Sequence, residues 1–192
     1  MASVVVVPYS NEWPGIFGQI REELVRAFDP ITVIIEHIGS TSVPELASKP
    51  VIDVLLGANS LAEIESKISA LNQLGFSYVP KYETELPIRR YFVKSSSGSL
   101  RIHLHAVELG SPIWVEHLTF RDALRNDSNL RSDYQYLKLQ LATQFSDNKS
   151  AYTAAKDPFI QSVLANAATK PICLTTQSRG LESSPVLVDT LS

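Results

Sequence analysis

The sequence of 192 residues has a single cysteine, Cys173. One cysteine excludes an intrachain disulfide and is typical of a reducing compartment. Long apolar runs are also missing, since no stretch approaches the roughly 18 residues that a membrane-spanning helix needs. The opening residues, MASVVVVPYS, lack the basic segment of a secretory signal, and their valine run is too short for its apolar segment. We therefore expect a cytoplasmic protein without a membrane partner.

An excess of positive charge is missing as well. The chain has 17 Lys and Arg against 20 Asp and Glu, which gives a formal net charge of −3 at pH 7. Proteins that coat nucleic acid neutralise its phosphates with many Lys and Arg, so we do not expect a nucleic-acid partner. The composition, 44% hydrophobic and 19% charged, is that of a globular protein. It leaves the oligomeric state open.

The spacing of apolar residues predicts an α+β fold with a helical last third. Spacings of four predict helices, and short β-branched runs predict strands. The predicted helices are 11–28, 61–71, 112–126, 130–145 and 150–167, the last one broken near Pro158. The predicted strands are 4–7, 31–38, 51–57, 76–80, 88–94 and 100–107. We expect one domain, 1–169, and a mobile tail, 170–192, because the tail is rich in Ser, Thr and Pro and has no sustained period.

The stretch HIGSTSVPELASKPVIDVLL (37–56) joins a hydroxyl-rich turn to an acid in an apolar strand. Gly39 and Ser40 follow a predicted strand, so the turn can offer backbone N–H groups and hydroxyls to a phosphate. Asp53 lies among valine, isoleucine and leucine residues, where an unpaired carboxylate is costly. Two interpretations remain open: Asp53 is a metal ligand, or it is held by hydrogen bonds or by Lys49.

Two histidines lie two residues apart in the predicted strand LRIHLHAV (100–107). His103 and His105 project from one face, because side chains alternate along a strand. Such a pair can bind a metal or grip a phosphate, and it is equally compatible with a half-exposed sheet face. His37, directly before the Gly-Ser turn, is either a site residue or a core histidine.

Basic residues in and near the predicted strands indicate a polyanionic ligand. Arg89 and Arg90 lie in one strand, and the planar guanidinium fork suits phosphate. Further basic candidates follow along the chain: Lys94, Arg101, Arg121, Lys138 and Lys156. Most residues of this kind are simply solvated, so we expect two or three of the set to be functional.

Several stretches resemble, in order, the successive motifs of the GrpB family: VVVVPYSNEWP, EHIGSTSVPELASKPVIDVLL, RRYFVK, RIHLHAVE, FRDALR, DYQYLKLQLA and AYTAAKDPFI. The resemblance covers residues 4–168, most of the chain. The GrpB family is placed in the nucleotidyltransferase superfamily, whose members have polymerase β-like folds. The resemblance therefore implies a polymerase β-like mixed sheet with helices, followed by a C-terminal helical cap.

The resemblance also implies a functional site. In the superfamily, a Gly-Ser turn grips the triphosphate of a nucleoside triphosphate (NTP), and the next strand carries carboxylates that bind a divalent metal. The residues implied for metal binding and catalysis are Asp53, His103 and His105. The residues predicted to bind nucleotide or phosphate are Gly39, Ser40, Thr41, Ser42, Lys49, Arg89 and Arg90.

Leu55 stands where the superfamily has its second carboxylate. One acid with two histidines is a softer donor set, better suited to Mn²⁺, Zn²⁺ or Ni²⁺ than to Mg²⁺. We therefore expect a metal-dependent nucleotidyltransferase that moves a nucleotidyl group from an NTP to an unidentified acceptor. The alternatives are a module that binds nucleotide or phosphate without catalysis, and a metal- or His-dependent phosphotransfer enzyme on the same fold.

Overall fold

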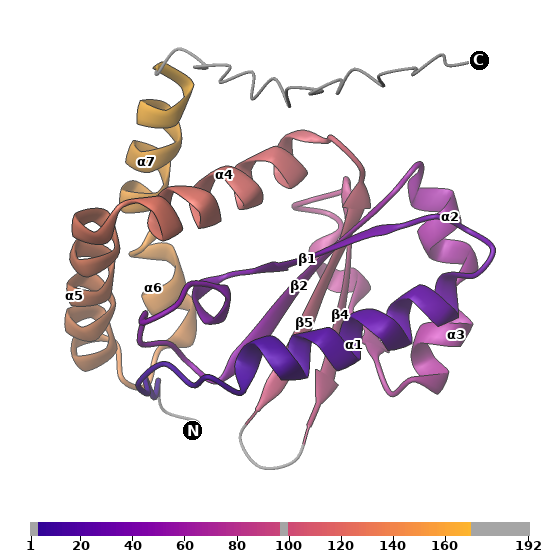
Figure 1. The fold of residues 1–192 in the computed structure, drawn as a ribbon, viewed down its shortest axis with the longest axis horizontal. Helices are drawn as coiled ribbons and strands as arrows, with labels where there is room; N and C mark the ends of the chain where they lie inside the picture. Colours follow the sequence, from indigo (N-terminus) through magenta and orange to yellow (C-terminus); the bar gives the residue numbers. More distant parts are fainter. Residues whose placement is uncertain (1–3, 97–99, 170–192) are drawn as a thin grey trace, which may run out of the picture.

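A five-stranded mixed sheet lies at the centre of the computed structural model, which describes residues 4–96 and 100–169 (Figure 1). Its strands are β1 (Ile34–Ile38), β2 (Val51–Ala58), β3 (Ser77–Tyr78), β4 (Arg89–Ser95) and β5 (Arg101–Glu108). They lie in the order β1-β2-β5-β4-β3. β2 and β5 are parallel, whereas β1 with β2, β4 with β5, and β3 with β4 are antiparallel. The α+β mixed sheet predicted from the sequence is confirmed.

Helices cover both faces of this sheet (Figure 1). α1 (Trp13–Phe28), α2 (Leu61–Ser66) and α3 (Ile68–Gln73) pack on one face, and α4 (Pro112–Asn126) packs on the other. The last three helices are α5 (Ser128–Gln144), α6 (Lys149–Ala154) and α7 (Asp157–Thr169). They stand beside the sheet, with α7 and α5 both in contact with α4. These helices are the C-terminal cap that the sequence predicted.

Alternation along β2 assigns its side chains to two separate cores. Ile52, Val54 and Leu56 are fully buried under α1, α2 and α3. Leu55 points to the opposite face and packs with Trp114 of α4. Because Asp53 alternates in the same way, its carboxylate lies on the α4 face, where the sequence placed it together with Leu55.

Gly57 allows α4 to approach the sheet closely. A Cβ atom at this position would lie 2.8 Å from Cζ3 of Trp114 and 2.8 Å from Cδ1 of Leu109. Both distances are shorter than ordinary van der Waals contacts, so the indole ring packs directly on the β2 backbone. The position of α4 over the candidate site therefore depends on a glycine in the strand.

Several predicted elements differ in the structure: the strands predicted over 31–38 and 76–80 are shorter, and two further elements change more. Residues 4–7 do not join the sheet: Val7 pairs only with Ser48, and Val4 donates its N–H to the carbonyl of Ser146. The valine run ties the N-terminus to the cap instead, because Val4 is buried against Leu141 and Tyr152. The helix predicted over 61–71 is divided into α2 and α3 at Lys67, whose backbone leaves the helical region.

Capping side chains define the helix starts. Ser60 accepts a hydrogen bond from the N–H of Glu63, and the Glu63 carboxylate accepts one from the N–H of Asn59. Asn148 caps α6, and Pro158 lies in the first turn of α7 after the predicted break. Asp127 caps α5 at its junction with α4.

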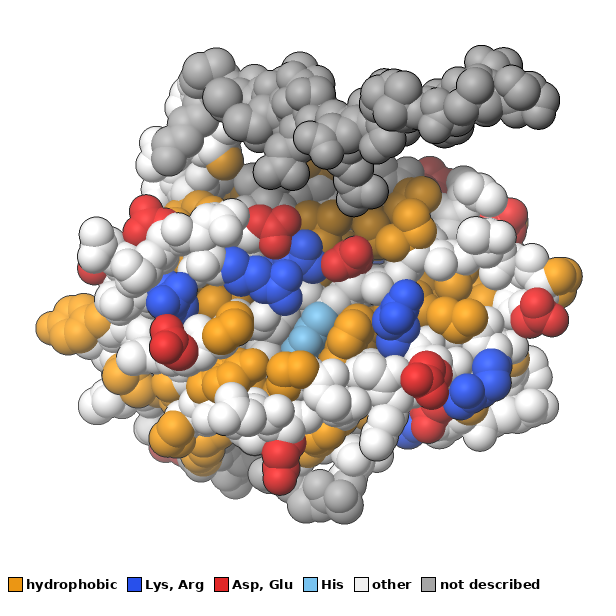
Figure 2. Space-filling view, viewed as in Figure 1, with side chains coloured by type: hydrophobic (Ala, Val, Ile, Leu, Met, Phe, Trp, Pro, Cys, Tyr) orange, Lys and Arg blue, Asp and Glu red, His pale blue; other side chains and the backbone are white. Residues whose placement is uncertain are grey.

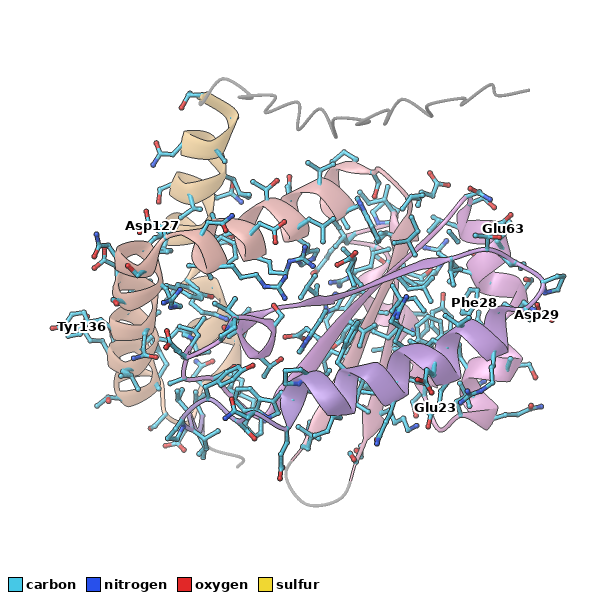
Figure 3. The ribbon with its side chains drawn as sticks, viewed as in Figure 1. Glu23, Phe28, Asp29, Glu63, Asp127 and Tyr136 are labelled. Atoms are coloured by element: carbon cyan, nitrogen blue, oxygen red, sulfur yellow. The ribbon has the colours of Figure 1, made fainter. Side chains whose placement is uncertain are left out.

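No helix in the described ranges is long and apolar enough to cross a membrane. Figure 2 shows acidic, basic and apolar side chains interspersed over the face that carries α1. In Figure 3, Phe28 points into the space between α1 and the sheet, whereas Tyr136 of α5 points away from the molecule. The tail 170–192, with Cys173, lies outside the described residues, so the prediction of a mobile segment stays a prediction.

Gly57→Ala tests the contact between β2 and α4. We expect the variant to lose about 1–3 kcal/mol of unfolding free energy, since overpacking costs that much in a filled core. Gly15→Ala is the matched control, because no atom lies within 4 Å of the added Cβ. In a helix, that change should stabilise the protein by about 0.4–1 kcal/mol. Urea unfolding measures both effects, and equal stability of Gly57→Ala and the parent protein would contradict the packing argument.

Candidate functional site

The Gly-Ser turn and Asp53 meet because the end of β1 lies opposite Asp53. Ile38 is paired with Asp53 in the β1–β2 register, so Gly39 follows directly beside the carboxylate. Gly39 has a φ of 69°, and a Cβ there would collide with Oδ2 of Asp53. Position 39 therefore requires glycine for two reasons: its backbone is left-handed, and the acid occupies the space that a side chain would need. The turn and the acid, about a dozen residues apart in the sequence, therefore lie side by side in one site.

Both predicted histidines face this carboxylate from β5. His103 lies opposite Asp53, and its Nδ1 is 3.4 Å from Oδ1 of Asp53. His105 lies two residues further along β5, and its Nε2 is 3.7 Å from the same oxygen. Burial alone would raise the pKa of the Asp53 carboxyl, but the hydrogen bonds and charges of the two histidines hold it well below its usual range. Asp53 is therefore a carboxylate at neutral pH.

Arg89 decides which nitrogen of His105 carries the proton. Nη1 of Arg89 lies 3.3 Å from Nδ1 of His105. A guanidinium can only donate, so Nδ1 must accept and the proton of the neutral ring sits on Nε2, facing Asp53. Burial lowers the pKa of His105, which keeps the ring neutral. His105 is thus arranged as a hydrogen-bond donor to Asp53, because metal binding through Nε2 would bring a proton to Nδ1 against Arg89.

Tyr91 and His117 also belong to this group, although the sequence reasoning missed them. Tyr91 lies between the histidines of β5, with its ring centroid 5.6 Å from His103 and 5.2 Å from His105. His117 of α4 reaches over His105, with ring centroids 5.5 Å apart. Burial lowers the pKa of His117 to about 4. The sequence could have indicated His117 by its position, since it lies one turn after Ile113 on the apolar side of a predicted helix.

Two lysines, Lys49 and Lys156, lie where the charge of Asp53 acts on them, and the charge of Lys156 acts in turn on a third, Lys138. Lys49 and Lys156 lie over the ring of Tyr152, with Nζ at 4.3 Å and 4.9 Å from its centroid. Lys138 of α5 donates to the carbonyl of Ala47 and lies over another tyrosine ring. Burial lowers the pKa of Lys49 to about 8 and that of Lys138 to about 7, and it also lowers the pKa of Lys156.

These lysines have no acidic partner in contact. Among the residues that the structure describes, none of the three forms an ion pair. The negative charge of Asp53 acts on both Lys49 and Lys156 and raises their pKa values against the effect of burial. Partly buried cations without carboxylates are costly by themselves, and an anion would offset that cost.

The hydroxyls of the turn are mostly used to hold the turn. Thr41 accepts a hydrogen bond from Nε2 of His37 at 3.1 Å and donates to the carbonyl of Val51 at 2.9 Å. Ser42 donates to the carbonyl of Gly39 at 2.6 Å. Both side chains are buried, and so is the side chain of His37, which turns away from Asp53 to Thr41. Gly39 and Ser40 are only half-buried and remain accessible to a ligand.

Arg90 is not brought together with the other predicted residues. Adjacent residues of β4 point to opposite faces, so Arg89 faces His105 while Arg90 faces α2. There, the Arg90 guanidinium pairs with Glu65 at 2.7 Å and with Glu83 at 3.6 Å. Its charge is compensated on the far side of the sheet from Asp53, so we leave Arg90 out of the site.

A metal ion would need ligands besides those of the protein. In residues 4–96 and 100–169, no group of three or more His, Cys, Asp or Glu side chains has an arrangement that could hold a metal. Asp53 and His103 are the donors that the contacts leave available. Mg²⁺ commonly binds through one or two carboxylates and completes its shell with water and substrate phosphates. The residues present therefore fit a cation that arrives with a nucleotide.

The fold defines the class of protein. Terminal uridylyl transferase 4 from Trypanosoma brucei, solved with bound dUTP, matches with a TM-score of 0.54 over 83% of this chain and 54% of that chain. The sequence identity is 11%, so this likeness concerns the fold alone. The protein has the polymerase β-like nucleotidyltransferase fold, as the motifs implied.

Within that fold class, the chain belongs to the GrpB family. The family model described as GrpB protein matches residues 3–166. The solved structure of the conserved protein GrpB from Enterococcus faecalis matches with a TM-score of 0.76 at 30% identity, over 85% of this chain and 96% of that chain. The UPF0157 protein YqkA of Bacillus subtilis (strain 168) is 37% identical over 164 residues. That match covers 85% of this chain, which spans 47% of the length of YqkA.

The Arg89–His105 contact predicts a single tautomer of His105. In ¹⁵N-histidine NMR spectra at neutral pH, we expect His105 to carry its proton on Nε2. Arg89→Met removes the donor at Nδ1, so the ring should then populate both tautomers, while Arg101→Gln on the exposed start of β5 should change nothing. His105→Gln identifies the signals. A parent protein with the proton on Nδ1 would contradict this assignment and would free Nε2 for a metal.

Two histidines with lowered pKa values, the buried His37 and the half-buried His117, predict that acid destabilises the fold. Burial lowers the pKa of His37 and of His117 from 6.5 to about 4. Between these pH values the unfolded chain binds protons that the folded chain does not. The contribution of each histidine to the unfolding free energy is therefore fully present above pH 6.5. As the pH falls towards 4, it is lost at about 1.4 kcal/mol per pH unit. Urea unfolding across this window measures the slope, and His117→Gln should reduce it; an unchanged slope in that variant would contradict the burial of a neutral His117.

Proposed function

We propose that this protein is a metal-dependent nucleotidyltransferase that transfers a nucleotidyl group from an NTP to an acceptor. One observation carries the proposal: the carboxylate of Asp53 lies between a glycine turn and lysines that have no acidic partner. A triphosphate bound with its divalent cation would bring a counter-charge both to the lysines and to Asp53. The phosphates would neutralise the lysines, and the cation would neutralise Asp53.

Each group has a role in this proposal. Gly39 and Ser40 would contact the phosphates, helped by Lys49 and Lys156, which add positive charge where negative charge develops during transfer. Asp53, with His103, would hold Mg²⁺ or Mn²⁺ delivered by the nucleotide. The cation supplies electrostatic stabilisation of the phosphoryl oxygens. Zn²⁺ or Ni²⁺ held by Asp53 and both histidines becomes the weaker alternative, because Arg89 holds His105 as a donor.

A binding module without catalysis is the second candidate, and Leu55 is the observation in its favour. Leu55 is fully buried under α4, so it offers no ligand where a second carboxylate would stand. A site with one carboxylate can still bind an NTP and its cation. It would then release the nucleotide intact, whatever acceptor is present.

Nucleotide binding is tested first by thermal unfolding with each NTP and with Mg²⁺ or Mn²⁺. A ligand present at about 100 times its Kd adds roughly 2.7 kcal/mol, which for this chain length raises the midpoint by about 5–11 °C. We expect one NTP to produce such a shift only with the cation. Metal analysis of the dialysed protein should find no stoichiometric metal. If no NTP shifts the midpoint, both candidate functions fail together.

Lys156→Gln and Asp53→Asn then separate the roles. Lys156→Gln should weaken NTP binding by about tenfold or more, since a hydrogen bond to a charged group contributes about 1.5–3 kcal/mol. Lys81→Gln is the control, because Lys81 is exposed on the far edge of the sheet near β3. Asp53→Asn should abolish the cation requirement with little change in melting temperature. Transfer of label from an α-³²P-NTP distinguishes the enzyme from the binding module.

A further inference from the structure

A pocket lies at the outer edge of β1, and Asp53 is not among its lining residues. Its volume is about 500 Å³, a size typical of small-molecule sites. The walls come from the segment leading into α1, from β1, from the chain after the Gly-Ser turn, and from α4 and the start of α5. Figure 2 shows basic side chains and a histidine gathered at the centre of this face, with apolar side chains beside them.

One wall of the pocket is flat and uncharged. The ring of Phe17 stacks on the ring of His37 with centroids 4.6 Å apart and an interplanar angle of 8°. His37 uses Nε2 on Thr41, and burial lowers its pKa to about 4, so the ring is neutral. Tyr9 and Pro44 extend the same apolar lining. This wall suits the face of a planar apolar group.

The other wall has more positive than negative charge. Three arginines and one glutamate line the pocket. Arg121 is compensated twice, by Glu36 at 2.6 Å and by Asp122 at 2.7 Å. Arg131 is paired with Glu45 at 3.0 Å.

Arg125 is the arginine without a carboxylate of its own. Its Nε and Nη2 both donate to the carbonyl of Ser42, at 3.0 and 2.8 Å. Nη1 lies 3.9 Å from Oδ1 of Asp122, an oxygen that already accepts from Arg121. The side chain of Arg125 is 37% exposed. One edge of its guanidinium is therefore available to an anion, next to the apolar wall.

We propose that this pocket binds a small molecule that combines a flat apolar ring with one anionic group, a carboxylate or a phosphate monoester. The ring would lie on the Phe17 wall, and the anion would accept from Nη1 of Arg125. An added β-strand fits less well, because the carbonyl of His37 on the free edge of β1 already accepts from Arg121 at 3.2 Å. This pocket is distinct from the proposed NTP site, although both border the turn that Arg125 holds through the carbonyl of Ser42.

Phenyl phosphate and benzoate are the probes, and NMR titration of the full chain measures their binding. Inorganic phosphate supplies the anion alone, and benzyl alcohol supplies the ring alone. We expect at least one of the two probes to bind about tenfold more tightly than either control, because it uses both walls. If neither probe binds more tightly than inorganic phosphate and benzyl alcohol, the proposal is wrong.

Variants locate the binding. Arg125→Gln should weaken probe binding by about tenfold, while Arg26→Gln, which changes an exposed arginine of α1, should leave it unchanged. Phe17→Leu removes the ring from the apolar wall without touching an arginine, and it should weaken the probes as well. Lys156→Gln should not alter their affinity. Binding that is lost in Lys156→Gln but kept in Arg125→Gln would assign the probes to the NTP site and overturn this proposal.

Discussion

The half-buried carboxylate of Asp53 is the constraint on which the rest of the site depends. It can lie in an apolar strand only because two imidazoles from β5 face it and because Gly39 leaves room for it. The turn that closes over the acid must then be held in place. Its own hydroxyls and the guanidinium of Arg125 do so from opposite sides. The position of one acid thus constrains the end of β1 and the turn, whereas Gly57 sets the approach of α4.

Charge is distributed unevenly around that acid. Lys49 and Lys156 lie on the side of the cap, and Arg89 lies on the side of β4, beyond His105. None of the three has a carboxylate within ion-pair distance in the described parts of the chain, whereas Arg90 on the opposite face has two. The protein therefore keeps uncompensated cations where a ligand can reach them. This contrast favours an anionic ligand at the site, although the net charge of the chain is −3.

The single carboxylate distinguishes this site from one built to hold two metal ions without a substrate. Leu55 has the place of a second acid and contributes to the core under α4 instead. His105 does not replace that acid, because Arg89 directs its proton towards Asp53. The chain offers a cation few ligands of its own, so in the proposed function cation and nucleotide bind together. The protein shares the fold of nucleotidyltransferases, and the charges at the centre of its site are balanced by histidines.

The sequence by itself determined the local elements and part of the site. The helix over 112–126, the break near Pro158 and the shared face of His103 and His105 all follow from spacing along the chain, and each is present in the structure. Long-range packing decided the rest. Strand alternation separates Arg89 from Arg90, but only the β4–β5 register shows which of them faces Asp53. Likewise, Lys156, in the turn between α6 and α7, and His117 of α4 reach the site from segments that no local pattern connects to it. Their positions depend on how the cap and α4 pack against the sheet.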